Sequence, residues 1–229
     1  MEQRAIIFDS GTLISLSMAC LLDVLRKLKT IFKGNFIITS DVEREIVDKP
    51  LNIKRFELEA LRIKKLITEK VLESPSVLGI DEKKLLKKVK EFNDIANTTF
   101  KGRGKDIHII DSGEASCLAL SKMLNEKKIK NVIAVDERTT RVLGENPTNL
   151  KKLLQKKLHT DIKYKKENFK YFEGIQFITS PELVYVAYKK NLFKLKDPRL
   201  LDSLLYSVKF KGAAISGEEI DEIKNLSKF

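Results

Sequence analysis

The residues of this chain that could do chemistry are carboxylates placed where apolar runs end. Asp9 follows the apolar residues 5–8, and Asp136 follows the apolar residues 132–135. Short, continuous apolar runs of this kind are typical of strands buried on both faces of a parallel sheet. Parallel strands end at one edge of their sheet, where α/β proteins bind ligands. The pattern therefore predicts that Asp9 and Asp136 lie at the same edge.

Two further acids are expected beside them. Residues 36–39 predict a second buried strand, followed by a helix that Ser40 caps and that carries Glu45. Glu114 opens a helix after residues 107–110. Four carboxylates brought together repel one another unless a divalent cation neutralises them, and hard oxygen ligands favour Mg²⁺ or Mn²⁺ over Zn²⁺. The expected site is therefore metal-dependent, and such an ion can activate water and stabilise charge on a phosphoryl group.

Each of these acids also has a simpler interpretation. Asp is a good N-cap, and an acid near a helix start complements the helix dipole. The alternative for any single acid is therefore a helix cap or a surface charge. The argument for a shared site depends on all four acids, Asp9, Glu45, Glu114 and Asp136, falling near strand ends together.

The elements that must position these acids alternate between strand and helix. This alternation predicts one three-layer α/β/α domain over residues 1–229, built on a mostly parallel sheet. Helical spacing predicts a single helix after Asp9 that extends to about Lys33 and ends at Gly34. Residues 175–178 predict the last strand, Ser180 the cap of the next helix, and Ser216 with Glu219 a capping box.

Residues 51–106 lack the strand–helix alternation of the rest of the chain and predict a basic helical insertion within this domain. Two amphipathic lysine-rich patterns indicate two helices, joined by a loop that contains Pro75 and Gly79. The insertion ends in residues 101–105, which we expect to form a flexible basic loop.

Composition limits the classes of partner and compartment. A net charge of +12 from 44 Lys and Arg against 32 Asp and Glu favours an anionic partner, either nucleic acid or an anionic membrane. No apolar run is long enough to span a bilayer, so no membrane association is expected. Cys20 and Cys117 provide no disulfide framework, and the chain starts without a signal pattern, so a cytoplasmic location is expected. His108 and His159 are far apart in the sequence and indicate neither a zinc site nor a histidine base.

The acids and their contexts resemble those of the PIN-domain nucleases. Members of that family open with an apolar strand ending in Asp and a small hydroxylic residue, as in Asp9-Ser10. Their second motif, Val-x-x-Glu, is matched by Val42 to Glu45, and one subgroup writes the third as Asp-x-Gly-Glu, as in residues 111–114. The fourth is an apolar strand ending in Asp and often a second acid, as in Asp136-Glu137. The resemblance covers residues 4–48 and 107–226.

This resemblance implies a metal-dependent endoribonuclease that leaves 5′-phosphate and 3′-hydroxyl ends. It places the metal on Asp9, Glu45, Glu114 and Asp136, with Asp111 as a further ligand. Ser10, Glu137 and Arg141 would be auxiliary residues. The commoner fourth motif carries Thr or Ser two positions before the Asp, where this chain has Ala134. A homodimer is a further expectation from the resemblance.

Basic residues are expected to hold the RNA. We expect Lys101, Arg103, Lys105, Lys165 and Lys166 to contact phosphates, because such contacts supply sequence-independent affinity. Nearby aromatic residues, Phe169 and Phe172 among them, could stack on bases. The alternative is a solvated basic surface with these aromatic residues in the core.

Three other functional interpretations remain. A PIN-like protein could bind RNA without cutting it, or serve as the toxin of a toxin–antitoxin pair with an antitoxin partner; the insertion favours a role in RNA processing with its partners. Residues 8–13 also resemble the start of haloacid dehalogenase-like phosphatases, but Gly11 stands where those enzymes need a second Asp as general acid.

Overall fold

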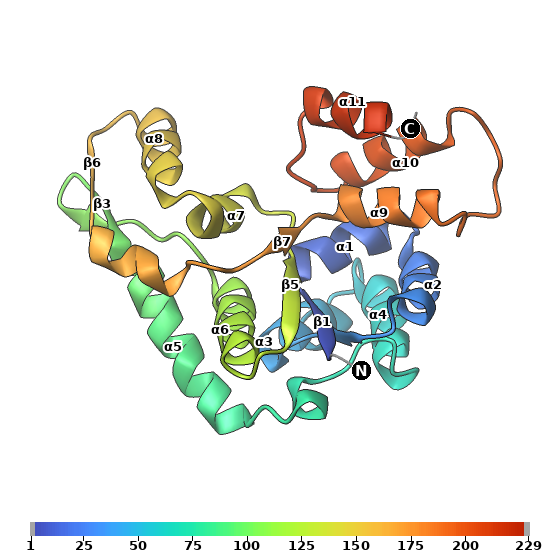
Figure 1. Ribbon diagram of the computed structural model, residues 1–229, viewed down its shortest axis with the longest axis horizontal. Helices are drawn as coiled ribbons and strands as arrows, with labels where there is room; N and C mark the ends of the chain where they lie inside the picture. The colour runs from blue at the N-terminus through green and yellow to red at the C-terminus, as the bar shows by residue number, and fades with distance from the viewer. Residues whose placement is uncertain (1–2, 227–229) are drawn as a thin grey trace.

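The computed structural model describes residues 3–226, and a four-stranded parallel sheet forms its centre (Figure 1). The strand order is β2-β1-β5-β7, and every pairing in this sheet is parallel. The strands are β1 (Arg4–Phe8), β2 (Asn35–Ile37), β5 (Lys130–Ala134) and β7 (Phe177–Ile178). The predicted α/β/α fold class is confirmed, and the carboxyl ends of all four strands meet at one edge.

Helices cover both faces of this sheet, which explains the uninterrupted apolar sequence of β1. Ile7 and Phe8 are fully buried. One face is covered by α6 (Ser112–Glu126), which also packs against α3 (Ser40–Glu43) and α5 (Glu82–Thr99). The other face carries α1 (Ser10–Met18), α2 (Leu22–Phe32) and α9 (Ser180–Lys189), which contact one another.

Further helices extend the domain at its two sides. After β5 the chain forms α7 (Arg138–Glu145) and α8 (Pro147–Leu158), which pack together. After α9 it forms α10 (Leu200–Lys209) and α11 (Gly217–Leu226), with a small apolar cluster of Leu201, Leu205 and Ile220. In Figure 1 these two groups lie on opposite sides of the upper edge of the sheet. No helix within residues 3–226 is long and apolar enough to cross a membrane.

The single helix predicted after Asp9 is wrong, because the chain breaks between α1 and α2. Cys20 takes a left-handed backbone conformation with φ +58°, and the Leu21 N–H donates to the Leu16 carbonyl at 2.8 Å. This turn buries Leu21 and Leu22. The expected role of Gly34 also differs. Lys33 takes the left-handed cap with φ +52°, whereas a Cβ at Gly34 would lie 2.7 Å from the Arg4 carbonyl of β1.

Two predicted helix caps shift by one residue toward the N-terminus. Thr39, not Ser40, caps α3, because its hydroxyl accepts a hydrogen bond from the Val42 N–H at 3.3 Å. Thr179, not Ser180, caps α9 through a capping box with Glu182. The predicted capping box of α11 is confirmed, with bonds of 2.6 and 3.1 Å between Ser216 and Glu219.

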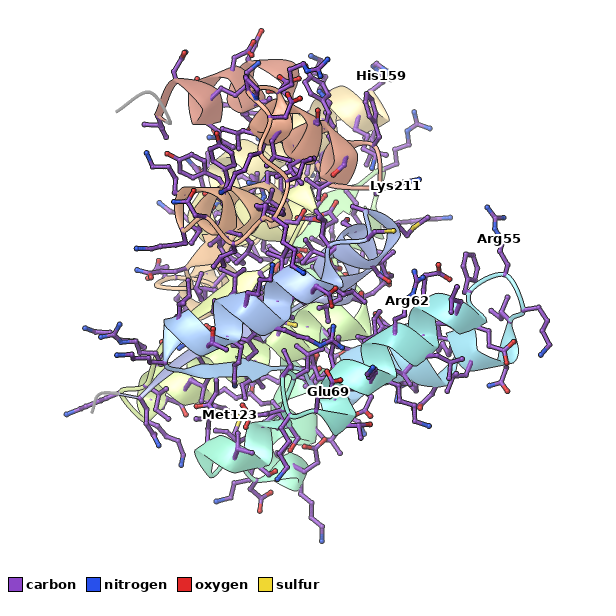
Figure 2. The ribbon with its side chains drawn as sticks, turned by 90° about the vertical axis from the view of Figure 1, so that its right-hand side faces the viewer. Arg55, Arg62, Glu69, Met123, His159 and Lys211 are labelled. Atoms are coloured by element: carbon purple, nitrogen blue, oxygen red, sulfur yellow. The ribbon has the colours of Figure 1, made fainter. Side chains whose placement is uncertain are left out.

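The segment 51–106 packs onto the domain at two places. Its first helix, α4 (Glu57–Thr68), contacts α1 and α2, whereas α5 contacts α6 extensively. Figure 2 shows Arg62 on α4 and Arg55 at the outer end of this projecting region. The chain between the helices pairs with the sheet edge through a parallel bridge from Glu73 to Ile37. The helical turn η1 (Arg44–Asp48) precedes the segment, η2 (Pro50–Asn52) begins it, and η3 (Pro75–Leu78) lies between its helices.

The flexible loop expected at residues 101–105 is instead a β-hairpin in a second, antiparallel sheet. Its order is β4-β3-β6, with β3 (Phe100–Gly102), β4 (Lys105–Asp106) and β6 (Ile162–Tyr164), and η4 (Lys166–Tyr171) follows β6. Arg103 and Gly104 form the turn with φ +50° and +78°. Positive φ at both central residues is typical of the tight turn that suits hairpin twist. The sequence did not reveal β6.

Candidate functional site

Asp9 is one of two acids, with Asp136, that are almost completely buried at the carboxyl edge of the sheet. It ends β1, caps α1 and is 3% exposed, and its Oδ2 accepts a hydrogen bond from the Gly11 N–H at 3.0 Å. Its other oxygen, Oδ1, is buried with no hydrogen-bond partner among the described residues. Burying a carboxylate oxygen without a hydrogen-bond partner costs free energy. A proton or a cation bound to Asp9 Oδ1 would remove this cost.

Burial, followed by the negative charge of Glu114, raises the pKa of Asp9 to about 7, and Glu45 makes a smaller contribution. Hydrogen bonds from the Gly11 and Ser10 backbones oppose these effects. No positively charged side chain is among the main causes of this pKa shift, although the chain has a net charge of +12. The acids around Asp9 are therefore left uncompensated by the described part of the protein.

Glu45 approaches Asp9 from the helix that follows β2. It lies on the π-helical turn η1, and its carboxylate rests against the backbone of Gly113 at the start of α6. A Cβ at Gly113 would lie 2.7 Å from Glu45 Oε2, so only glycine allows this approach. The first turn of a helix attracts negative charge. The Glu45 side chain has no hydrogen bond or ion pair within residues 3–226, so its oxygens are free to accept a ligand.

Glu114 is held from two sides. Its Oε2 accepts from the Asp111 N–H at 2.9 Å, and its Oε1 accepts from the Thr140 hydroxyl of α7 at 2.5 Å. Burial raises its pKa, the two hydrogen bonds oppose the rise, and the charges of Glu137 and Asp111 add to it. Glu114 thus faces Asp9 while linking α6 to α7.

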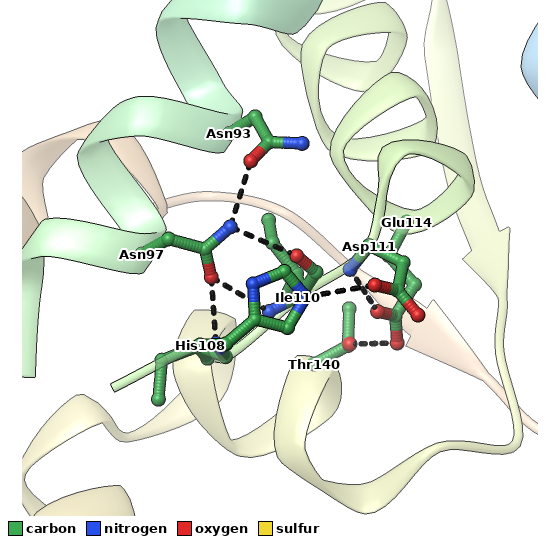
Figure 3. A network of polar contacts seen from close by, with 8 residues as sticks. Asn93, Asn97, His108, Ile110, Asp111, Glu114 and Thr140 are labelled. Atoms are coloured by element: carbon green, nitrogen blue, oxygen red, sulfur yellow. Dashed lines mark hydrogen bonds and ion pairs between the residues drawn. The ribbon is translucent and has the colours of Figure 1, made fainter. Parts of the chain in front are cut away.

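The loop before α6 is fixed by Asn97 of α5, as Figure 3 shows. The Asn97 side-chain oxygen accepts from the N–H groups of Ile109 and Ile110 at 2.6 and 3.1 Å, and its amide donates to the Ile110 carbonyl at 3.0 Å. Asp111, at the exposed end of this loop, pairs with His108 at 2.7 Å. A helix of the 51–106 segment therefore sets the position of Asp111 and Glu114.

Asp136 is turned toward a different partner. It is 3% exposed, and both of its oxygens accept hydrogen bonds from Ser180, one from the N–H and one from the hydroxyl, each at 2.8 Å. Asp9 and Asp136 still end adjacent strands, since the Asp9 N–H bonds to the Ala134 carbonyl at 2.9 Å. The structure thus brings Glu45 and Glu114 within electrostatic range of Asp9. Asp136 instead connects α9 to the end of β5 through its hydrogen bonds to Ser180.

The predicted auxiliary residues have structural partners. Glu137 is exposed and caps α7 by accepting from the Thr140 N–H at 2.8 Å. Arg141 donates to the Ala214 carbonyl at 3.3 Å and lines a pocket between α7, α9 and α11. Ser10 is the first residue of α1, and its backbone N–H stabilises the charged form of Asp9.

Cys117 lies beneath the acids on α6 and provides no nucleophile. It is 1% exposed, and its thiol faces the Phe8 carbonyl at 3.7 Å. Burial raises the pKa of this thiol well above its ordinary value, and the charges of Asp9 and Glu114 raise it further. The thiol therefore stays protonated, which excludes thiolate chemistry at this site.

The donor set suits a hard divalent cation, although the side chains are not in a ligating arrangement. Within the described residues, no group of three or more His, Cys, Asp and Glu side chains is arranged to hold a metal ion. The unpartnered Oδ1 of Asp9 and the free carboxylate of Glu45 nonetheless fit Mg²⁺ or Mn²⁺, which prefer carboxylate oxygens.

The predicted RNA-binding residues fall on the antiparallel sheet. Arg103 and Lys105 are exposed at the hairpin turn, Lys101 is partly exposed on β3, and Lys165 and Lys166 follow β6 in exposed positions. Pairing of β3 with β6 brings the two groups together. Phe169 and Phe172, by contrast, are buried, so these two aromatic rings belong to the core and are not available for stacking on bases.

Sequence reasoning missed the residues that hold the acids in place. Thr140, Ser180, Asn97 and Gly113 form the contacts described above, and His108 pairs with Asp111. Asp-x-Gly-Glu could have signalled Gly113, because the glycine stands inside the first helical turn. No local pattern points to Asn97. The sequence predicts Ser180 only as a helix cap, because its partner Asp136 is 44 residues away. Comparison of the chain with models of known protein families, with curated proteins and with solved structures finds no match.

Proposed function

We propose that this protein is a Mg²⁺- or Mn²⁺-dependent endoribonuclease with a PIN-like arrangement of acids. The observation that carries the proposal is Asp9: a buried carboxylate with an unpartnered oxygen, beside Glu114 and Glu45, with no basic side chain to neutralise them. Burying such a cluster without a counter-ion opposes folding, and a bound cation would remove this cost. A cytoplasmic role in RNA processing fits the two free cysteines.

In this proposal Asp9, Glu45 and Glu114 hold the cation, and Asp136 and Asp111 support the site from its rim. When bound, it would activate water and stabilise the charge that develops on the scissile phosphate. Asn97, Thr140 and Ser180 keep Asp111, Glu114 and Asp136 in place through the hydrogen bonds described above. Ser10, partly exposed at the start of α1, would orient the substrate.

A second function, binding RNA without cutting it, is favoured by a different observation. Four acids of the site already have structural roles, because Asp9 and Glu137 cap helices, Glu114 bonds to Thr140, and Asp136 bonds to Ser180. If these roles were the only ones, the protein would bind neither Mg²⁺ nor Mn²⁺ at this edge.

Cleavage and metal binding measured together distinguish the two functions. An end-labelled, unstructured RNA is incubated with the protein and Mn²⁺, and thermal unfolding is recorded with and without Mn²⁺. We expect wild-type cleavage, a fall of about 100-fold or more in Asp9→Asn, and a metal-dependent rise in melting temperature that the variant lacks. Wild-type protein that neither cleaves RNA nor gains stability from Mn²⁺ or Mg²⁺ would contradict the proposal.

Gly113→Ala is a second probe, because it disturbs Glu45 without removing a carboxylate. The new methyl group would displace the Glu45 carboxylate, from which it is only 2.7 Å away, and we expect weaker metal binding and slower cleavage. Gly217→Ala is the matched control at the start of α11, where the nearest atom is 4.0 Å away. Equal metal affinity in both variants would show that Glu45 is not a ligand.

A further inference from the structure

The antiparallel sheet joins two basic segments that are far apart in sequence. Strand β3 pairs with β6, and Lys101 stands directly opposite Lys163. The lysine-rich helix α8 packs against β6. In Figure 1 the sheet and α8 lie together on the α7 side of the molecule, away from α9 to α11. We call residues 100–106 and 147–166 the basic lobe.

Most of the net charge of the protein is concentrated in this basic lobe. It contains ten basic and two acidic residues, so it carries +8 of the net charge of +12. The basic residues are Lys101, Arg103, Lys105, Lys151, Lys152, Lys156, Lys157, Lys163, Lys165 and Lys166. Helix α8 contributes four of these lysines and contains no acid.

The positive charge is scarcely neutralised from within. Among the described residues, Lys101 is the one basic side chain of the lobe that forms an ion pair, with Asp106 at 3.3 Å. The other acid of the lobe, Asp161, accepts a hydrogen bond from Gln155 at 3.1 Å. Elsewhere lysines have acidic partners, as Lys88 has in Glu126 and Lys29 in Glu73. The lobe therefore presents free cationic groups to solvent.

The lobe is packed onto apolar and aromatic side chains, which hold its strands and α8 in place. Phe100 of β3 and Ile162 of β6 are buried, and Tyr164 stacks on Phe169 at 5.4 Å between ring centroids. Lys151 of α8 lies over the Tyr164 ring at 5.4 Å. Like charges placed opposite each other on paired strands, such as Lys101 and Lys163, destabilise the pairing. A polyanion bound across the lobe would remove this repulsion.

We propose that the basic lobe is an anchoring surface for the sugar-phosphate backbone of RNA, separate from the acids at the sheet edge. This inference rests on the proposed function for its choice of RNA as the polyanion. Helix α7 joins the two places, because it begins just after Asp136 and packs against α8. An RNA held on the lobe and long enough to pass α7 reaches the acids, whereas a very short RNA contacts only one of the two places.

The test compares two variants of the full chain that lose the same charge. The lobe variant replaces the exposed Lys152, Lys156, Lys163 and Lys165 by Gln, and the control replaces Lys83, Lys84, Lys87 and Lys90, which are exposed on α5. Affinity for a labelled 30-nucleotide RNA is measured with EDTA present, so that no cleavage occurs, over a range of salt concentrations. Circular dichroism confirms that both variants fold.

We expect the lobe variant to bind RNA at least about 10-fold more weakly, and its salt dependence to flatten by up to about three, since each phosphate contact on a single strand contributes about 0.7 to the slope. The control variant should stay within about twofold of wild type. Equal losses in both variants would show a general charge effect and overturn the proposal. So would unchanged RNA affinity, or lobe-dependent binding to phosphatidylserine vesicles without binding to RNA.

Cleavage in Mn²⁺ then separates this inference from the proposed function. The lobe variant should cleave a 30-nucleotide RNA more slowly but a five-nucleotide RNA at the wild-type rate. Lobe-dependent binding without any cleavage would contradict the proposed nuclease function and support the anchoring surface. Equal cleavage of both RNA lengths by the two variants would support the nuclease function and contradict the anchoring surface.

Discussion

The charge on Asp9 decides how the site responds to pH. Its pKa is raised from 3.8 to about 7, mainly by burial. Between these values the folded protein holds a proton on Asp9 that the unfolded chain has released. Because the folded state binds more protons at Asp9 in this window, the contribution of Asp9 to the free energy of unfolding falls as the pH rises from about 4 to about 7. The full cost of ionising Asp9 is therefore reached above about pH 7, where a cation would stabilise the site most.

Asp9→Asn should remove this pH dependence. Asparagine keeps an oxygen that can accept the Gly11 N–H, so the cap of α1 is retained. Relative to wild type, we expect the variant to gain up to about 4 kcal/mol in unfolding free energy as the pH rises from 4 to 8. Urea unfolding at several pH values without metal measures the difference.

Asp94→Asn is the control, because Asp94 is exposed on α5. Its stability should run parallel to that of wild type over the same pH range. A constant difference between Asp9→Asn and wild type from pH 4 to 8 would show that Asp9 is ionised in the folded protein without penalty.

The geometry of the site depends on hydrogen bonds that connect helices to strands and to one another; we call these contacts joints. Asp136 at the end of β5 holds the first turn of α9 through Ser180, and Glu114 of α6 holds α7 through Thr140. Asn97 of α5 holds the loop that enters α6. Each joint is a buried or partly buried polar contact, so each fixes one orientation of an element that apolar packing alone would leave adjustable.

Ser180→Ala tests the joint between β5 and α9. The substitution leaves one oxygen of the buried Asp136 carboxylate without its hydroxyl donor, and we expect a loss of about 1–3 kcal/mol in unfolding free energy. Ser17→Ala is matched to it, because the Ser17 hydroxyl is buried without a partner among the described residues. That change should be neutral within about 0.5 kcal/mol or stabilising. Equal effects in urea unfolding would mean that the Ser180–Asp136 contact contributes nothing.

At the scale of the whole molecule, the segment 51–106 shares the core of the sheet domain. Leu66, Leu72, Phe92 and Phe100 belong to the same apolar cluster as Ile7 and Phe8. Phe92 of α5 meets Tyr171 and Phe172 edge-to-face, with ring centroids 6.3 and 6.0 Å apart. The segment therefore does not form a core of its own, and its folding is coupled to that of the site.

Phe92→Ala should accordingly destabilise the entire domain in one transition. We expect a loss of about 3–5 kcal/mol, with fluorescence and circular dichroism giving the same unfolding midpoint. Leu86→Ala on the same helix is the control, since Leu86 is 44% exposed and its change should cost less than about 0.5 kcal/mol. Two separate transitions in the Phe92 variant would show that the segment unfolds independently.

Local patterns were enough to predict the buried parallel strands and the acids that follow them, because apolar runs ending in Asp9 and Asp136 can be recognised from neighbouring residues alone. It could not determine where each carboxylate turns. That choice depends on Ser180, Thr140 and Gly113, which reach Asp136, Glu114 and Glu45 only once the chain has folded.

The tertiary structure also decided the form of the basic surface. Residues 101–105 look like a loop alone, and β3 forms because β6, about sixty residues later, supplies its hydrogen-bonding partners. Likewise, the break at Cys20 follows from burying Leu21 and Leu22 against the core, which helical periodicity does not record. Local patterns specify elements, whereas long-range packing specifies which of their side chains meet.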